Sequence, residues 1–460
     1  MRLVFEKLKS AFESKWLILP LFFVELVLQS LGLYSIGVLI LAIVLALILL
    51  FCDDVKNIFA IIFYVSFFIG NIFINANWLI YGTAIAIAGV SFIYFVISRI
   101  IKRKLSGEKF RTSRIFIPLV IISVIYCLGG AISNFQLVPF IVTIGFSLAV
   151  LFFVFVASNY TNNLKRYLPF LFTVGAITIL IEMLITNAVE GKSILTIFTV
   201  NPLVSVGAQN INVAALYMLI GLISCFALGY KKKNSHLYLI LATIIAAGII
   251  VSICRMIILL AFLSYAFLSI YSLAKLERKT AYVITLSIMV FFIVGFIVLD
   301  LLYIKDIIVS ILYKIEGSNF FSGRIRIWSW CVDKFKENPL LGVGFVHEEI
   351  QPILNSNPTS IILAHNTLIQ WLVSLGALGT LFMLAFTVCK YKIVAKSVKE
   401  CGIFIPLILY VITLSGITDQ AAQMDIFVYA ISLITLVSID DCSPLKTLLP
   451  LKKRKLTGEK

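Results

Sequence analysis

Long apolar runs alternate with short polar or charged connections along nearly all of the 460 residues. Most runs are about 17 to 22 residues long, the length that a helix needs to cross roughly 30 Å of hydrocarbon. They are too long and too continuous for the alternating strands of an outer-membrane barrel. The pattern therefore predicts an all-α, polytopic membrane protein.

We predict about fourteen transmembrane helices, which form a single membrane domain over residues 1–460. The first run follows a charged amphipathic leader without a small-residue cleavage site, so we expect it to be retained. The run 237–274 is about twice one crossing and must turn near Ser252 to Arg255. The expected ranges are 16–33, 35–52, 58–74, 78–98, 115–133, 137–157, 167–187, 211–229, 237–253, 256–274, 281–300, 364–389, 402–418 and 424–440.

Composition agrees with this class, because 61% hydrophobic residues and a mean hydropathy of +1.08 exclude a soluble domain. The eight cysteines are scattered singly, so we predict neither a disulfide framework nor a zinc site. With both termini cytoplasmic, eight of the 38 Lys and Arg residues fall outside and the other thirty inside. The net charge of +16 then reflects topology and contact with anionic lipid, and no nucleic-acid partner is expected.

Arginines are the unusual cations on the predicted outer side, where they occupy a turn and a large loop, residues 301–363. Arg255 lies at the outer end of two apolar helices, and Arg324 and Arg326 lie in the loop. An isolated Arg drawn into hydrocarbon would cost about 2.5 to 3.5 kcal/mol. Arg255 either serves a site or reaches lipid headgroups or a nearby acid.

The loop contains an amphipathic segment that is too short to span a membrane and stops at Asn338-Pro339. Its apolar residues recur at helical spacing, at Ile325, Trp328, Val332 and Phe335. We predict a helix along the outer membrane surface, with Ser322 as its N-cap and Arg324 in its first turn. That turn is suited to phosphate, although contact with lipid phosphates without selectivity explains it equally.

His365 and Asn366 stand at the outer mouth of the predicted helix 364–389. At 100° per residue, Gly376 and Gly379 fall within about 40° of His365 on one face. Two glycines allow a neighbouring helix to approach closely, which would aim the histidine into the bundle. A catalytic histidine and an ordinary interfacial hydrogen-bonding residue both fit this position.

Together, three segments resemble the signature of the O-antigen ligase and O-antigen polymerase superfamily. One is His365-Asn366 followed, after nine residues, by Gly376-Ala-Leu-Gly379. The second runs from Ser322-Gly-Arg324 through Trp328 to Asn338-Pro-Leu-Leu-Gly-Val-Gly344, and the third is Ser252-x-x-Arg255. The motif-bearing region covers roughly residues 205–380. Three such elements in the right order are specific together, whereas each alone is weak.

The resemblance implies a glycosyltransferase that uses an undecaprenyl-diphosphate-linked glycan on the outer face of the bacterial cytoplasmic membrane. By the same resemblance, Arg324 and Arg255 would clamp the diphosphate with help from Arg326, and His365 would accept or orient the acceptor's proton. Asn366, Ser322, Asn212 and Asp419 are further candidates for substrate binding. Glu348, Glu349 and Asp333 are typical of a solvent-exposed surface and not of a metal site, so we expect neither a metal nor another cofactor.

The sequence leaves open whether the chain acts as a polymerase or a ligase in lipopolysaccharide, capsule or related synthesis. Expected partners are the acceptor glycan or glycolipid, membrane lipid, and a flippase and chain-length regulator of the same pathway. The alternative is that the chain itself transports the lipid-linked glycan. A transporter places charges in a midplane cavity, and Glu25 and Glu182 within predicted spans are the residues that would serve one.

Overall fold

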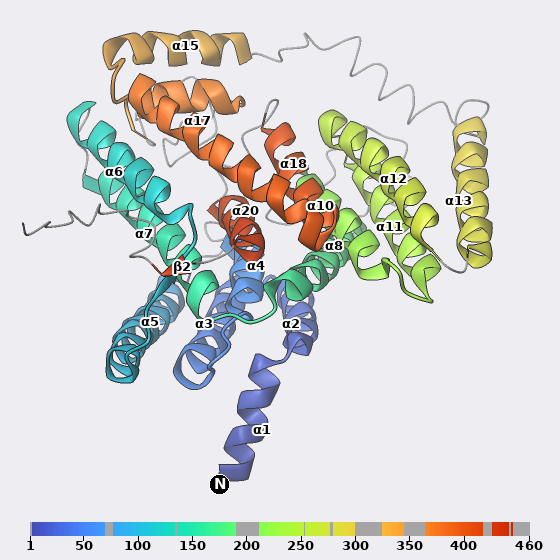
Figure 1. Cartoon of the computed structure of the whole chain (residues 1–460), viewed down its shortest axis with the longest axis horizontal. Helices are drawn as coiled ribbons and strands as arrows, with labels where there is room; N and C mark the ends of the chain where they lie inside the picture. The colour runs from blue at the N-terminus through green and yellow to red at the C-terminus, as the bar shows by residue number, and fades with distance from the viewer. Residues whose placement is uncertain are drawn as a thin grey trace, which may run out of the picture.

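The protein is described by a computed structural model in which nearly all of the assigned structure is helical (Figure 1). The described residues are 2–69, 77–133, 137–189, 211–252, 254–276, 279–299, 324–344, 364–416, 426–440 and 443–444. A short antiparallel pair joins β1 (Arg111–Thr112) to β2 (Ser443–Pro444). The predicted all-helical class is therefore confirmed.

Each of the fourteen predicted runs coincides with a helix. These are α2 (Ile18–Ser30), α3 (Tyr34–Phe51), α4 (Ile58–Ile69), α5 (Trp78–Ser106), α6 (Phe116–Ser133), α7 (Leu137–Asn159), α8 (Leu164–Val189), α10 (Ile211–Gly229), α11 (Ser235–Val251), α12 (Arg255–Lys275), α13 (Thr280–Leu299), α17 (Thr367–Cys401), α18 (Phe404–Ser415) and α20 (Ile426–Ile439). The other helices in the described residues are α1 (Arg2–Glu13), η1 (Lys15–Leu17) and α15 (Arg324–Glu337). Among the described residues, six helices are long and apolar enough to cross a membrane: α3, α5, α8, α10, α12 and α17. Fourteen crossings remain a prediction.

Helices α8 and α10 form the centre of the bundle, and the residues of α10 are almost all buried. A Cβ on Gly221 of α10 would lie 2.8 Å from the Phe172 carbonyl oxygen and would overlap Ala176 of α8. Small residues at this crossing let the two backbones approach closely, as is common between membrane helices. Around this centre, α11, α12 and α18 pack on α10, and α2 packs on α8.

One end of the bundle gathers charged side chains from segments far apart in sequence. Asp53, after α3, accepts hydrogen bonds from Lys9 of α1 (2.5 Å) and Arg99 of α5 (2.9 Å). The Lys9 hydrogen bond is the main reason that the pKa of Asp53 falls to about 2. Arg114, which precedes α6, pairs with Asp440 at the end of α20 (3.3 Å). These are the helix ends that the cation pattern assigns to the cytoplasm.

Helix α15 lies across the start of α17, away from α1 (Figure 1). The helix predicted in this part of the loop is present, but its packing face differs from the expected one. Ile327, Trp330 and the buried Cys331 pack toward α17, whereas Ile325 and Val332 are 62% and 46% exposed. The expected apolar stripe is thus divided: Ile325 and Val332 are exposed, which suits an interface with lipid, whereas Trp328 and Phe335 are half-buried.

Candidate functional site

His365 is held in an uncommon backbone conformation immediately before α17 begins. Its φ is 49°, in the left-handed region, and its side chain is half-buried. Asn366 is the N-cap of α17, and its Oδ1 accepts hydrogen bonds from the N–H groups of Leu368 (3.0 Å) and Ile369 (3.1 Å). Asparagine is among the best N-cap residues because its side chain satisfies these otherwise unpaired donors. A non-glycine residue at positive φ persists where its surroundings fix it, as at many functional sites.

The backbone at Ala364, next to His365, is fixed from two sides. The Trp328 indole Nε1 of α15 donates to the Ala364 carbonyl oxygen (2.7 Å). The Ala364 N–H donates to Gln370 Oε1 (3.1 Å), and Gln370 Nε2 donates to Ser374 Oγ (2.8 Å). Gln370 and Ser374 are buried, so water does not compete for these bonds. The histidine segment is therefore tied both to α15 and to the first part of α17.

Helix α17 is broken at Gly376, where φ is 64° and ψ is −170°. The segment 339–344, which follows α15, pairs with the backbone on both sides of this break. Four hydrogen bonds join them, from Val343 N to Val373 O (2.8 Å), Gly344 N to Ser374 O (3.1 Å), Ala377 N to Pro339 O (2.8 Å) and Leu378 N to Leu340 O (3.2 Å). The break thus exposes backbone groups of α17 that the incoming segment satisfies.

Glycines make this crossing possible because backbone touches backbone. A Cβ on Gly376 would overlap the Leu340 carbonyl group, and one on Gly342 would lie 2.5 Å from the Gly376 nitrogen. A Cβ on Gly344 would lie 2.7 Å from Gly130 Cα in α6. We name residues 339–344, Gly376 and the Gly129-Gly130 pair the glycine crossing. Each of these contacts leaves no room for a larger residue.

The break corrects the expected helical arrangement of His365, Gly376 and Gly379. The helix begins at Thr367, and the angle of 100° per residue does not carry through the non-helical Gly376. Gly376 meets the non-helical segment 339–344 instead of a neighbouring helix. Gly379 does lie close to another helix, since its Cβ would come within 3.0 Å of Ile125 in α6. The expectation of close approach is confirmed there, whereas the shared face is wrong.

The other predicted site residues are described to different extents. Arg255 is the first residue of α12, and Arg324 is the first residue of α15, so the sharp turn near 252–255 and the first-turn position of Arg324 are confirmed. Arg326 is the third residue of α15, in the same first turn, and Asn212 is the half-buried second residue of α10. The backbone of these three arginines is described but the positions of their side chains are not. Ser322 and Asp419 lie outside the described residues.

Acidic residues near the candidate site show no metal-binding arrangement in the described part of the chain. There, no group of three or more His, Cys, Asp or Glu residues could hold a metal ion. Asp333 pairs with Lys336 on an exposed side of α15 (3.0 Å), as expected for a solvated face. Glu348 and Glu349 lie outside the described residues. A requirement for metal is left to experiment.

Residues 240–384 match the family model for O-antigen ligase. These residues make up about a third of the chain. This match runs from α11 to the middle of α17 and includes Arg255, Arg324, Arg326, His365 and Asn366. The family indicates a membrane protein with a glycosyl-transfer role in polysaccharide biosynthesis, acting on lipid-linked glycan and acceptor substrates. No curated protein matches the chain.

Three features of the candidate site and its surroundings were missed by sequence reasoning. The Gly129-Gly130 pair lies outside the recognised motifs, although a glycine pair in an apolar run signals close contact. Gln370 was not singled out, although it is a buried polar residue near the start of α17. Lys390 was placed just beyond the predicted helix end, but α17 continues to Cys401 and buries it. Little in the sequence signals this burial, because Lys390 is the first of four lysines, at positions 390, 392, 396 and 399, which is typical of the polar end of a span.

Proposed function

We propose that this chain transfers a glycan from an undecaprenyl-diphosphate carrier to an acceptor hydroxyl on the outer face of the cytoplasmic membrane. The observation that supports this most is the fixed position of His365, at the start of a broken helix within the matched residues. Trp328 holds the adjoining backbone and so couples this position to α15, whose first residue is Arg324. A general base must be placed within hydrogen-bond reach of its proton, and a rigid backbone favours this.

In the proposed reaction, the acceptor oxygen attacks the anomeric carbon of the lipid-linked sugar. The bond from that carbon to the diphosphate oxygen breaks, and undecaprenyl diphosphate leaves with the bonding electron pair. His365 accepts the acceptor's proton or orients its hydroxyl. Arg324 and Arg255 stabilise the leaving diphosphate, with Arg326 assisting, because guanidinium groups offer two donors to a phosphate.

The remaining candidates have supporting roles in the proposal. Asn366 already caps α17 through its carbonyl oxygen, so a contact with substrate would use the rest of its amide. Ser322, Asn212 and Asp419 would bind the acceptor or the glycan. The charged end formed around Asp53 faces the cytoplasm in this proposal, which puts both termini there and His365 outside. The acceptor is a second lipid-linked repeat for a polymerase, or a terminal glycolipid for a ligase.

The test is an in vitro transfer assay with purified protein, a lipid-linked oligosaccharide and a chelator, with glycan length read on a gel. We expect His365→Ala to lower the transfer rate by about 10²- to 10⁴-fold, the usual contribution of a general base. Arg324→Lys keeps the charge but loses the paired N–H donors of the guanidinium group, and should lower the transfer rate about tenfold or more. His236→Ala and Arg166→Lys, away from the site, are the matched controls and should leave the rate unchanged.

The products distinguish the possible activities. A ladder of longer lipid-linked chains establishes a polymerase, and transfer only to an added glycolipid establishes a ligase. Loss of activity with chelator contradicts the expected metal independence. A flippase is the second candidate, because Glu25 and Glu182 are buried and Gln29 Nε2 donates to Glu182 Oε1 (2.9 Å). No transfer with any acceptor, together with glycan transport that needs these two acids, would favour it.

A further inference from the structure

A partly open cavity lies between α17, α18 and α20, and Thr367, two residues after His365, is part of its lining. Its volume is about 80 Å³, and its polar lining includes Thr367, Trp371, Thr387, Lys390, Thr413 and Ser432. Thr367 N–H donates to the carbonyl oxygen of Gly416 (3.0 Å), which joins the start of α17 to the end of α18 at the cavity. A space of this size has room for several waters or for a small oxyanion group.

Lys390 brings a cation into this cavity and is only 9% exposed. Its Nζ donates to Thr413 Oγ1 (2.5 Å) and lies 6.0 Å from the centre of the Tyr391 ring. Among the described residues, no carboxylate lies within ion-pair distance of this amine. Thr413 Oγ1 in turn donates to the Leu409 carbonyl oxygen (2.8 Å), so it offers the amine a neutral partner. A buried ammonium without a counter-charge is unfavourable, which makes Lys390 a ready partner for an anion.

Trp371 adds a second donor to the same cavity. Its indole Nε1 is buried and has no hydrogen-bond acceptor in the described structure. An N–H group can only donate, so an acceptor oxygen in the cavity would satisfy it. The hydroxyl of Ser432, which is also 9% exposed, can rotate to donate as well. The cavity therefore presents a charge and donors that match a small oxyanion.

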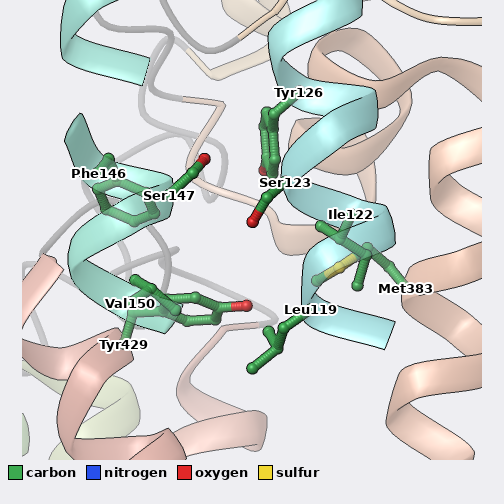
Figure 2. Close-up of a pocket in the computed structure, with 9 residues that line it drawn as sticks. All are labelled: Leu119, Ile122, Ser123, Tyr126, Phe146, Ser147, Val150, Met383 and Tyr429. Atoms are coloured by element: carbon green, nitrogen blue, oxygen red, sulfur yellow. The ribbon is translucent and has the colours of Figure 1, made fainter. Parts of the chain in front are cut away.

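A neighbouring cavity between α6, α7, α17 and α20 provides a contrast (Figure 2). Its volume is about 30 Å³, and its polar groups are the hydroxyls of Ser123, Ser147 and two tyrosines. None of its lining residues is charged. Met383 and Tyr429 line both cavities and lie between them. This smaller space suits a water molecule, so the charge of Lys390 distinguishes the larger one.

We propose that the cavity between α17, α18 and α20 binds a phosphate oxyanion, with Lys390 supplying the charge and Trp371 and Ser432 supplying hydrogen bonds. The proposal rests on the proposed function in taking the phosphate of a polyprenyl lipid as the source, and free phosphate would present the same chemistry. Lys390 and Ser432 lie outside residues 240–384, so the pocket extends beyond the matched O-antigen ligase domain. It would hold one phosphoryl group of the carrier beside His365.

The test measures binding to the purified full-length chain in detergent, with three probes. Undecaprenyl phosphate carries the charge, undecaprenol has the same chain without it, and sodium phosphate has no chain. We expect the wild type to prefer undecaprenyl phosphate to undecaprenol at least tenfold, and Lys390→Met to remove this preference while undecaprenol affinity stays unchanged. Lys392→Met is the matched control, because Lys392 is exposed on the same helix. An unchanged preference in Lys390→Met overturns the proposal.

Tryptophan fluorescence gives a second readout in case Lys390→Met does not fold. Undecaprenyl phosphate should change the emission of the wild type, and this change should disappear in Trp371→Phe. The same change in both proteins would place the lipid elsewhere and overturn the proposal. If sodium phosphate displaces the lipid from the wild type but not from Lys390→Met, the cavity is an oxyanion site and its ligand is free phosphate. Binding is measured without turnover, so Lys390-dependent binding in a chain without transfer activity refutes only the proposed function.

Discussion

Replacing Gly376 by alanine tests whether the glycine crossing fixes the candidate site. Two separate costs are expected. An alanine at φ 64° and ψ −170° would occupy a region that is essentially restricted to glycine, and this strain costs about 1 to 3 kcal/mol of stability. Its Cβ would also overlap the Leu340 carbonyl group, and relief of such overpacking costs about 1 to 3 kcal/mol. Together they predict a destabilisation of about 2 to 6 kcal/mol.

Two other glycines separate these costs. Gly32 also has a positive φ of 68°, but a Cβ there meets nothing within 4 Å, so Gly32→Ala carries only the backbone cost of about 1 to 2 kcal/mol. Gly89 lies inside α5 with nothing within 4 Å and no positive φ. Gly89→Ala should therefore be neutral or stabilise the protein by up to about 1 kcal/mol. From highest to lowest, the expected order of thermal midpoints is Gly89→Ala, wild type, Gly32→Ala and Gly376→Ala.

The assay is thermal unfolding in detergent, monitored through the labelling of cysteines as they become exposed. Cys52, Cys225 and Cys331 are suitable probes because they are buried in the folded chain. Glycosyl transfer is measured on the same preparations below their midpoints. We expect Gly376→Ala to lose transfer even where it is folded, because the break orients the first part of α17, whose Gln370 accepts a hydrogen bond from the N–H of Ala364 next to His365. A midpoint for Gly376→Ala equal to that of Gly32→Ala, with normal transfer, would refute this account.

Two further predictions concern the helix cap and the charged end of the bundle. Asn366→Ala should destabilise the protein by about 1 kcal/mol through loss of the N-cap, whereas Asn366→Asp keeps a capping oxygen and should leave the thermal midpoint unchanged. If Asn366→Asp lowers the transfer rate at an unchanged midpoint, the amide has a role in substrate binding. The pKa of Asp53 is lowered to about 2, so its contribution to stability is present above the unfolded pKa of about 3.9 and is lost as the pH falls toward 2. Asp53→Asn should flatten the pH dependence of the midpoint in that window, and an unchanged dependence would show that other acids dominate it.

The helices were the most predictable part of the fold because hydrophobic length is a local property of the sequence. Each predicted run contains a helix, and the turn before Arg255 falls where the double-length run required it. Ends were less predictable, since α17 continues past residue 389 to Cys401 and α18 ends early, at Ser415. Packing of neighbouring helices, and not hydropathy, shelters Lys390 and so permits the longer helix.

The set of candidate site residues stays a prediction, and the backbone geometry around them could not be predicted from the sequence. The residues at His365, Arg324 and Arg255 could be selected because polar groups stand out at the ends of apolar runs. The break at Gly376 could not be predicted, because an isolated glycine in a helical pattern is compatible with a regular helix. Its conformation depends on the segment 339–344, more than thirty residues earlier in the chain, which supplies the partners for the interrupted helix.

The glycine crossing divides the recognised motif residues into two physical classes. Gly342, Gly344 and Gly376 are required because the backbones touch, so their substitution acts through stability and position. His365 and the arginines stand at or next to helix starts, and the proposed function assigns them contacts with the substrate. A variant of the first class should therefore lower the midpoint and the transfer rate together. A variant of the second should lower the rate at an unchanged midpoint, and a histidine variant that fails this separation would have a structural role.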